Sequence, residues 1–137
     1  MDVGRVRESV PFLHVADMSA SLAFYRDGLG FEMPLHWMDE GVLRWCQLKL
    51  GGASIMLQAY RPGRVPAETR GVGLSVTFMC EDALAIWRAT RSRGLHAIQR
   101  PFVGNGLWVV SFVDPDGYRL DFESPTDAAE ETEYDGE

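Results

Sequence analysis

The segment DPDGYRLDFESP, residues 114–125, combines a turn with an extended strand. Its first four residues, DPDG, carry proline and glycine at positions that tight turns favour. In the remaining residues, the apolar side chains of Leu120 and Phe122 alternate with the charged side chain of Asp121. Because successive side chains of a strand point to opposite faces, Asp121 lies on the face opposite to the apolar pair. The segment therefore predicts a hairpin strand with one apolar face and one face that meets either solvent or a binding site.

The same succession of patterns occurs twice along the chain. A buried strand that ends at an acidic residue is followed by a helix, an edge strand and a hairpin. An offset of 65 residues relates the two copies and places Asp17 on Asp82 and Gly52 on Gly117. The expected elements are VPFLHVAD (10–17), MSASLAFYRDGLG (18–30), FEMPLHW (31–37), VLRWCQLKL (42–50) and ASIMLQAY (53–60), then LSVTFMCED (74–82), ALAIWRATRSRGL (83–95), HAIQRPFVGNG (96–106), LWVVSFV (107–113) and YRLDFESP (118–125). The pattern indicates an internal duplication.

The composition predicts one globular domain with an acidic tail. The chain has 137 residues, of which 46% are hydrophobic and 24% charged, an ordinary mixture for a single folded domain. Six of the 20 acidic residues lie in the last eleven positions, which leaves 14 acidic residues against all 13 basic ones in the rest of the chain. We expect such a tail to be disordered or loosely docked. Nucleic-acid binding is not expected, because phosphate contacts require a basic face.

The sequence also predicts a cytoplasmic protein without a membrane partner. It has no run of about 18 apolar residues, the length that a membrane-spanning helix needs, and its first ten residues lack the apolar core of a secretory signal. The two cysteines, Cys46 and Cys80, have no spacing typical of a metal or redox pair. Both lie in apolar stretches, which indicates buried thiols in a reducing compartment.

Two segments carry a resemblance to a known family. PFLHVADMSASLAFYRDGLGFEM (11–33) resembles the opening of a vicinal oxygen chelate module, and SFVDPDGYRLDFESP (111–125) resembles its closing hairpin. This superfamily includes glyoxalase I, extradiol dioxygenases, fosfomycin resistance proteins and bleomycin resistance proteins. The resemblance covers roughly residues 9–125. It implies an α+β fold of two tandem βαβββ modules, whose mostly antiparallel strands form a half-open β-barrel around a cleft. Many members are homodimers, some with strands exchanged between protomers, so we expect a homodimer.

The resemblance and the repeat together predict the domain limits. Residues 1–8 form an N-terminal lead, residues 9–126 a single domain, and residues 127–137 the acidic tail. Within the domain, we expect module one at about 9–62, a connector at about 63–73 and module two at about 74–126.

The alternation along each strand separates side chains that pack under the helices from those that face the cleft. Across the Gly51–Gly52 turn, Leu48 is expected to pair with Ile55, and Cys46 with Leu57, under the first helix. The cleft-facing side chains of the first module are then Val10, Phe12, His14, Trp45, Gln47, Met56 and Gln58. Those of the second module are Ser75, Thr77, Met79, Trp108, Val110, Phe112 and Asp121. The assignment of Trp108, Val110 and Phe112 depends on the register of the second hairpin.

No metal site or other cofactor is expected. The resemblance implies that metal-dependent relatives carry ligands at four related positions, which in this chain read Val10, Met56, Ser75 and Asp121. A divalent ion needs three or four converging nitrogen, oxygen or sulfur donors. Valine offers none, and a thioether and a hydroxyl are poor ligands for hard ions.

The cleft composition is typical of a small-molecule site, with apolar walls and a few polar anchors. The predicted ligand-binding residues are Phe12, His14, Trp45, Gln47, Met56, Gln58, Trp108, Phe112 and Asp121. Aromatic side chains of this kind suit a flat or cationic ligand. The first interpretation is metal-free binding or sequestration of a small organic molecule, in the manner of bleomycin resistance proteins. The sequence does not identify the ligand.

The sequence leaves open whether the protein is an enzyme. A lyase, isomerase or dioxygenase-type enzyme of the same superfamily is the alternative, with Asp121 as a metal ligand in the metal-dependent case. The catalytic candidates are His14 and Asp121, and they would have to converge in one cavity. Gln47 or Gln58 would then stabilise an oxyanion. A third interpretation is a purely structural dimer, which requires a cleft filled by side chains.

Overall fold

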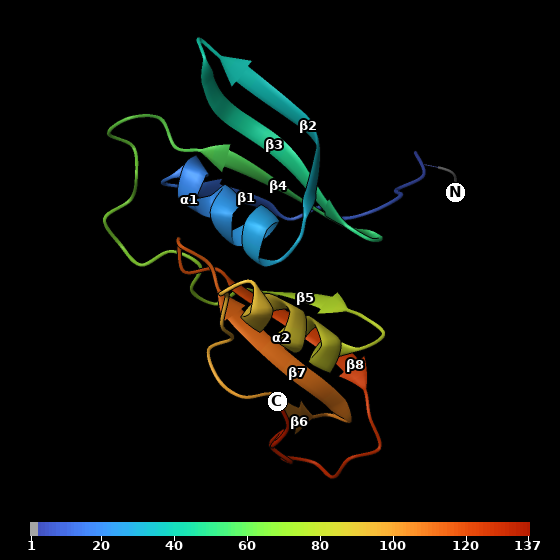
Figure 1. Cartoon of the computed structure of the whole chain (residues 1–137). Coiled ribbons are helices and arrows are strands. Elements are labelled where there is room, and N and C mark those ends of the chain that lie inside the picture. The colour runs from blue at the N-terminus through green and yellow to red at the C-terminus, as the bar shows by residue number, and fades with distance from the viewer. Residues whose placement is uncertain (1–2) are drawn as a thin grey trace.

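The computed structural model describes residues 3–137 and contains two successive units with the same order of elements (Figure 1). The first unit consists of β1 (Phe12–Val15), α1 (Met18–Leu22), its π-helical continuation η1 (Ala23–Gly28), β2 (Glu32–Asp39), β3 (Val42–Leu50) and β4 (Ala53–Ala59). The second consists of β5 (Ser75–Met79), α2 (Ala83–Ser92), β6 (Phe102–Gly104), β7 (Leu107–Val113) and β8 (Arg119–Pro125). The predicted βαβββ order thus occurs twice.

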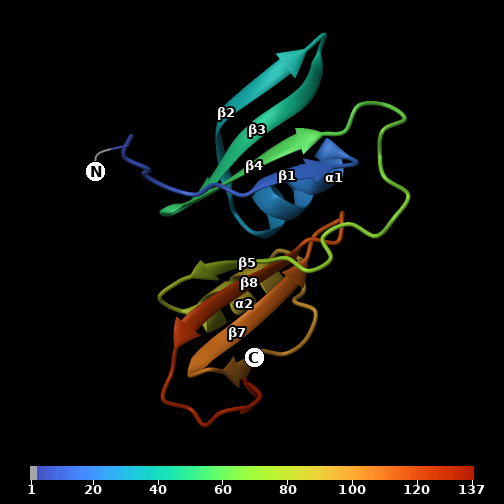
Figure 2. The ribbon, with the colours of Figure 1, turned by 180° about the vertical axis from the view of Figure 1, so that it is seen from behind.

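Each unit forms a four-stranded sheet, in the order β1-β4-β3-β2 and β5-β8-β7-β6. The pairs β1–β4 and β5–β8 are parallel, and the other pairs are antiparallel. The helices cover one face of the sheets, and the opposite face is turned to the viewer in Figure 2. Strands β1 and β5 are the edges turned toward the other module, whereas β2 and β6 are the outer edges (Figures 1 and 2). The sheets do not close into a barrel, so the predicted half-open α+β fold is confirmed.

Both helices begin in the same way at related positions of the repeat. The side chain of Asp17 accepts a hydrogen bond from the backbone amide of Ala20, and that of Asp82 accepts one from Ala85. Such caps satisfy amides that have no partner inside the helix. The acidic residue that ends each first strand therefore sets the start of the following helix.

The apolar face of the first hairpin follows the predicted register. Leu48 pairs with Ile55 and Cys46 with Leu57, and all four side chains are fully buried. A two-residue turn fixes the pairing of its strands, and a pairing shifted by one residue would expose this set. The short hairpin turn and the buried core therefore support the same arrangement.

The prediction that Trp108, Val110 and Phe112 share a face with Asp121 is wrong. Asp121 pairs with Ser111, so the even-numbered side chains of β7 lie on the opposite face. Val110 and Phe112 are buried in the core, and Trp108 packs against it. These aromatic residues therefore belong to the helix side of the second sheet.

The cause is one additional residue between β7 and β8. In the first hairpin Gln47 pairs with Met56, and in the second Ser111 pairs with Asp121. The last strands of the two modules are thus related by the offset of 65 residues, whereas β3 and β7 are related by 64. A change of one residue exchanges the two faces of a strand.

The acidic tail docks against the second sheet, so of the two expected arrangements, disordered or docked, the structure shows the docked one. Phe102 in the edge strand β6 forms an antiparallel bridge with Glu133. The amide of Val103 donates to the carbonyl of Thr132 at 2.9 Å. The tail therefore satisfies backbone groups that the edge strand would otherwise leave without a partner.

Tyr134 anchors the tail through its aromatic ring. The ring packs edge-on against Trp87 of α2, with centroids 5.5 Å apart, and against Trp108 of β7, with centroids 5.7 Å apart. Aromatic pairs favour this edge-to-face arrangement. The guanidinium of Arg100 also donates to the carbonyl of Tyr134 at 2.7 Å. The sequence pattern did not reveal these contacts because the charges of the tail dominate its composition.

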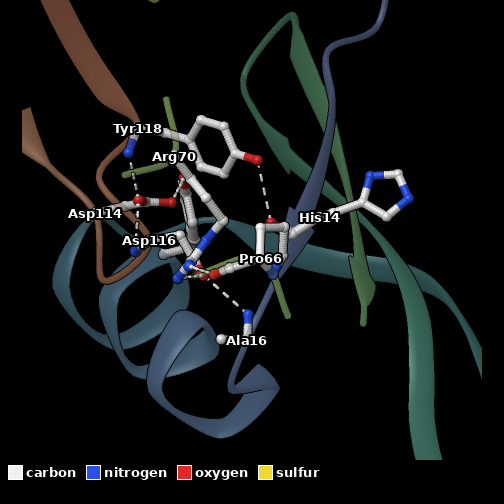
Figure 3. Close-up of polar contacts among 8 residues, drawn as sticks. His14, Ala16, Pro66, Arg70, Asp114, Asp116 and Tyr118 are labelled. Carbon is white, nitrogen blue, oxygen red and sulfur yellow. Dashed lines mark hydrogen bonds and ion pairs between the residues drawn. The ribbon is translucent and has the colours of Figure 1, made fainter. Parts of the chain in front are cut away.

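The DPDG turn joins the two modules (Figure 3). One carboxylate oxygen of Asp116 accepts from the backbone amide of Ala16, at 2.9 Å, and from the guanidinium of Arg70, at 2.8 Å. Tyr118 reaches the same strand end, where its hydroxyl donates to the carbonyl of His14 at 3.2 Å. Asp116 therefore connects the second hairpin to the first module and to the connector between the modules.

Asp114 forms a second link within the same turn. Its carboxylate accepts from the hydroxyl of Tyr25 at 2.7 Å and from the backbone amides of Asp116 and Tyr118 at 2.9 and 2.8 Å. Burial raises the pKa of the Asp114 carboxyl above its ordinary value of 3.8, although these hydrogen bonds oppose the rise. Burial, followed by the charge of Asp114, raises the pKa of Tyr25 well above its ordinary range, so Tyr25 remains a donor.

Substitutions at Asp114 should separate hydrogen bonding from charge. Asp114→Ala leaves buried donors without an acceptor and should lower the free energy of unfolding by about 3 kcal/mol. In Asp114→Asn, the amide oxygen can accept from the two backbone amides and the NH₂ group can donate to Tyr25. This variant should therefore lose much less stability than the alanine variant, as measured by urea unfolding.

The pH dependence of the same variants has a defined sign. A carboxyl whose folded pKa is raised contributes stability below about pH 4, and that contribution is lost as the pH rises through the raised pKa. The asparagine variant does not ionise at this position. Relative to the wild type, Asp114→Asn should therefore gain stability as the pH increases from about 4 toward neutrality. Parallel stability curves for the two proteins would contradict this assignment.

Candidate functional site

The helix-free face of the first sheet is aromatic. Two rows of paired residues cross it, Phe12–Met56–Gln47–Leu35 and His14–Gln58–Trp45–Trp37. Trp37 remains 51% exposed and Phe12 41% exposed. Apart from His14, none of the eight side chains in these rows is ionisable. The face therefore offers a largely apolar surface, on which the amides of Gln47 and Gln58, the imidazole of His14 and the indole N–H groups can form hydrogen bonds.

His14 lies within an aromatic group at the β1 edge of this face. Its ring is 5.3 Å from that of Phe12 and 5.5 Å from that of Tyr60, measured between centroids. Figure 3 shows the imidazole pointing away from the DPDG turn, while the backbone carbonyl of the same residue accepts from Tyr118. The imidazole is therefore part of the helix-free face and not of the junction between the modules.

The helix-free face of the second sheet carries a polar cluster around Asp121, beside apolar side chains of β7. The side chain of Asp121 is flanked by its paired neighbours Thr77 on β5 and Ser111 on β7. Its carboxylate accepts from the hydroxyl of Ser111 at 2.5 Å and from the Nε of Arg119 at 3.1 Å. Asp121 thus lies on the helix-free face of the second sheet, where Arg119 and Ser111 engage its charge.

The structure brings together most of the predicted ligand-binding residues, but not all. Phe12, His14, Trp45, Gln47, Met56 and Gln58 lie on one face of the first sheet. Asp121 lies on the other sheet, and Trp108 and Phe112 lie on the helix side of that sheet. Within the described part of the chain, the His14 ring contacts Phe12 and Tyr60, whereas Asp121 bonds to Ser111 and Arg119, so no recorded contact joins the two catalytic candidates.

Several residues of these faces were not predicted from the sequence. Trp37 is paired with Trp45 and belongs to the aromatic face, although the strand alternation around Pro34 is interrupted by register shifts in β2. Tyr60 directly follows β4 and reaches His14. The same alternation that placed Asp121 also places Arg119, two residues earlier, on its face. The alternation that places Arg119 was visible in the sequence. Placing Ser111 beside Asp121 also required the correct register of the second hairpin.

The residues at the four family ligand positions do not fit a divalent ion. Met56 offers a thioether and Ser75 a hydroxyl, both poor ligands for hard ions, and Val10 offers no donor. The carboxylate of Asp121 is already bound to Arg119 and Ser111. Among residues 3–137, no three His, Cys, Asp or Glu side chains form a group that could hold a metal ion. We therefore derive no step through a metal at this site.

Neither thiol is suited to nucleophilic chemistry. Cys46 is fully buried, and burial raises the pKa of its thiol to about 11. Burial also raises the pKa of Cys80, whose thiol donates to the carbonyl of Glu123 at 3.5 Å. Because the thiolate is the reactive form, both side chains are poor nucleophiles at neutral pH.

A groove of about 580 Å³ lies between the modules, away from the aromatic face. Its lining includes the first hairpin turn, Leu50–Ala53, together with Cys80 and Glu81 after β5. The corresponding junction at the DPDG turn is filled by the side chains of Asp114 and Asp116. The glycines at positions 51 and 52 supply no side chains to fill the space. The groove thus follows from the difference between the two turns.

Comparisons with known proteins agree with this architecture. Residues 8–122 match the family model described as Glyoxalase/Bleomycin resistance protein/Dioxygenase superfamily. The search among curated sequences gave no match. No helix within residues 3–137 has the length and apolar character needed to cross a membrane.

Three solved structures illustrate the similarity of the fold. A glyoxalase/bleomycin resistance protein from Catenulispora acidiphila DSM 44928 is 25% identical, with a TM-score of 0.64 and coverage of 86% of this chain and 97% of that chain. A bleomycin-binding protein complexed with bleomycin is 22% identical, with a TM-score of 0.66 and coverage of 88% and 100%. TnmS3, an antibiotic binding protein from Streptomyces sp. CB03234, is 21% identical, with a TM-score of 0.65 and coverage of 90% and 100%.

The difference between the aromatic face and the core predicts unequal effects of two tryptophan substitutions. Trp87 is 2% exposed, so Trp87→Ala should lower the free energy of unfolding by about 3 to 5 kcal/mol. Trp37 is half exposed, and Trp37→Ala should cost less than about 1 kcal/mol in the isolated chain. Urea unfolding at low protein concentration measures both values. Equal losses would show that Trp37 is not at an open surface.

Proposed function

Because the chain belongs to the Glyoxalase/Bleomycin resistance protein/Dioxygenase superfamily, we propose that it binds a small organic molecule, without a metal, against the aromatic face of its first sheet. The observation that carries the proposal is the aromatic surface on which Phe12 and Trp37 are exposed and Trp45 is half-buried. Folded chains normally bury such large side chains, and an apolar patch left exposed is typical of a binding surface.

The chemistry of the face suits a flat, largely apolar ligand. Trp37 and Trp45 are neighbours across paired strands, so their rings can cover one aromatic system. Gln47 and Gln58 offer both donors and acceptors beside them. The structural neighbours whose titles name bleomycin or antibiotic binding are consistent with this use of the fold.

We propose further that a second copy of the chain completes the site. One chain presents an aromatic face on its first sheet and a polar face on its second, and neither is covered by a helix. A homodimer that brings the first sheet of one copy over the second sheet of the other would combine apolar walls with polar anchors, as small-molecule sites require. The free cysteines are consistent with a cytoplasmic location.

Binding can be measured with N-phenyl-1-naphthylamine, a neutral aromatic probe that fluoresces in apolar surroundings. The wild type should enhance its fluorescence, and Trp45→Ala should weaken its binding about tenfold, because the ring loses a stacking surface. Val72→Ala is the matched control, since Val72 is 78% exposed in the connector and outside the site. Unchanged binding by the Trp45 variant would contradict the proposed location.

Native mass spectrometry tests the assembly and the absence of a metal together. The protein, purified without added metal or chelator, should appear as a dimer without a bound divalent ion. The reason is that the donor set around Asp121 is incomplete and its carboxylate is engaged. One divalent ion per chain would overturn the metal-free proposal and favour the enzymatic alternative. A monomer at micromolar concentration would overturn the shared site.

A further inference from the structure

Arg119 is held in a fixed orientation on the polar face of the second sheet. Its Nε donates to both carboxylate oxygens of Asp121, at 3.1 and 3.4 Å, and its Nη2 donates to the hydroxyl of Ser111 at 3.0 Å. The same hydroxyl donates to Asp121 at 2.5 Å. Three side chains from two neighbouring strands therefore form one closed network.

The network presents a donor, and not an acceptor, to the site. The side chain of Asp121 is 10% exposed, whereas that of Arg119 is 43% exposed. None of the hydrogen bonds found among residues 3–137 uses the Nη1 of Arg119. The carboxylate at the family ligand position thus acts on the arginine and is not itself offered to a ligand.

A pre-oriented arginine is an effective anchor for an oxygen anion. Guanidinium groups form strong, charge-assisted hydrogen bonds with carboxylates. A free arginine loses side-chain entropy when it orders around a ligand, and here Asp121 and Ser111 have already ordered the side chain. The two aromatic rows of the first sheet contain no acidic residue, lysine or arginine, and Lys49, farther along the same face, is paired with Glu32.

We propose that Arg119 determines the charge preference of the site, so that the ligand is an aromatic molecule with a carboxylate or a similar oxygen anion. This inference rests on the proposed function, because it names the class of ligand for the same site. Asp121 is a positioning residue for Arg119.

On the second sheet, the carboxylate nearest to this network on the same strand face is that of Glu123, which would favour a cationic ligand. Its carboxylate lies on the same face of β8, four residues from Arg119 and about 13 Å along the strand. The two groups are far enough apart that one small ligand group contacts one or the other. A cationic ligand held by Glu123 is therefore a distinct and measurable outcome.

Three probes with one aromatic skeleton test the proposal by competition with N-phenyl-1-naphthylamine. They are 2-naphthylacetate, the neutral 2-naphthylacetamide and the cationic 2-(2-naphthyl)ethylamine. The wild type should bind the acetate about tenfold more tightly than the acetamide. This ratio corresponds to the lower end of the contribution that a hydrogen bond to a charged group makes to affinity. Arg119→Gln should remove this preference, because it weakens the binding of the acetate more than that of the acetamide.

Two further variants keep the test independent of folding defects. Arg119→Gln leaves the carboxylate of Asp121 without its cation, so the double variant Arg119→Gln/Asp121→Asn removes both charges together. It should show the same loss of preference. Glu123→Gln is the matched control on the same strand and should retain the preference for the acetate.

The outcomes separate this proposal from the proposed function. If N-phenyl-1-naphthylamine does not bind, the binding function and the role of Arg119 both fail. If it binds but the acetate has no advantage over the acetamide, only the role of Arg119 is overturned. The role of Arg119 is also overturned if the double variant still prefers the acetate. It is overturned as well if the wild type prefers the amine and Glu123→Gln abolishes the preference for the amine.

Discussion

The carboxylate of Asp116 is shared between the backbone amide of Ala16 and the guanidinium of Arg70, and the position of one sheet relative to the other depends on this contact. The amide belongs to the residue between the first strand and the first helix, and the arginine belongs to the connector. Close packing reinforces the contact, since a Cβ atom on Gly71 would lie 2.5 Å from the carbonyl oxygen of Gly117. The two modules therefore share one polar junction as well as one apolar core.

The sequence was sufficient for the fold because the duplication repeats every local signal. A strand, an aspartate cap and a hairpin occur twice at one spacing, and the two-residue Gly51–Gly52 turn specifies the pairing of Cys46 with Leu57. The same regular offset, applied to β7, assigned its side chains to the wrong faces of the sheet. One extra residue in the DPDG connection is small in the sequence but exchanges the faces of the whole strand, so Trp108 and Phe112 moved from the site to the core.

The candidate site was accessible to sequence reasoning only in part. The aromatic residues of the first sheet followed from alternation, whereas the network of Arg119, Asp121 and Ser111 depends on side-chain geometry. The position of Asp121 in the family pattern identified this residue as a candidate. Its partner Arg119 neutralises the carboxylate, so the pair offers a ligand a positive group in place of a negative one. After duplication, the two faces have diverged: Met56 in the apolar module corresponds to Asp121 in the polar one.

The docked tail limits how copies of the chain can add to one another. Each module has one outer edge, β2 in the first and β6 in the second, and the tail pairs with β6 through Phe102 and Glu133. Unlimited head-to-tail growth by strand pairing needs two different open edges on every copy. With β6 covered, β2 is the outer edge left open, and two identical β2 edges can pair only once, around a twofold axis. The docked tail therefore favours closed pairs over open-ended growth at the outer edges of the sheets.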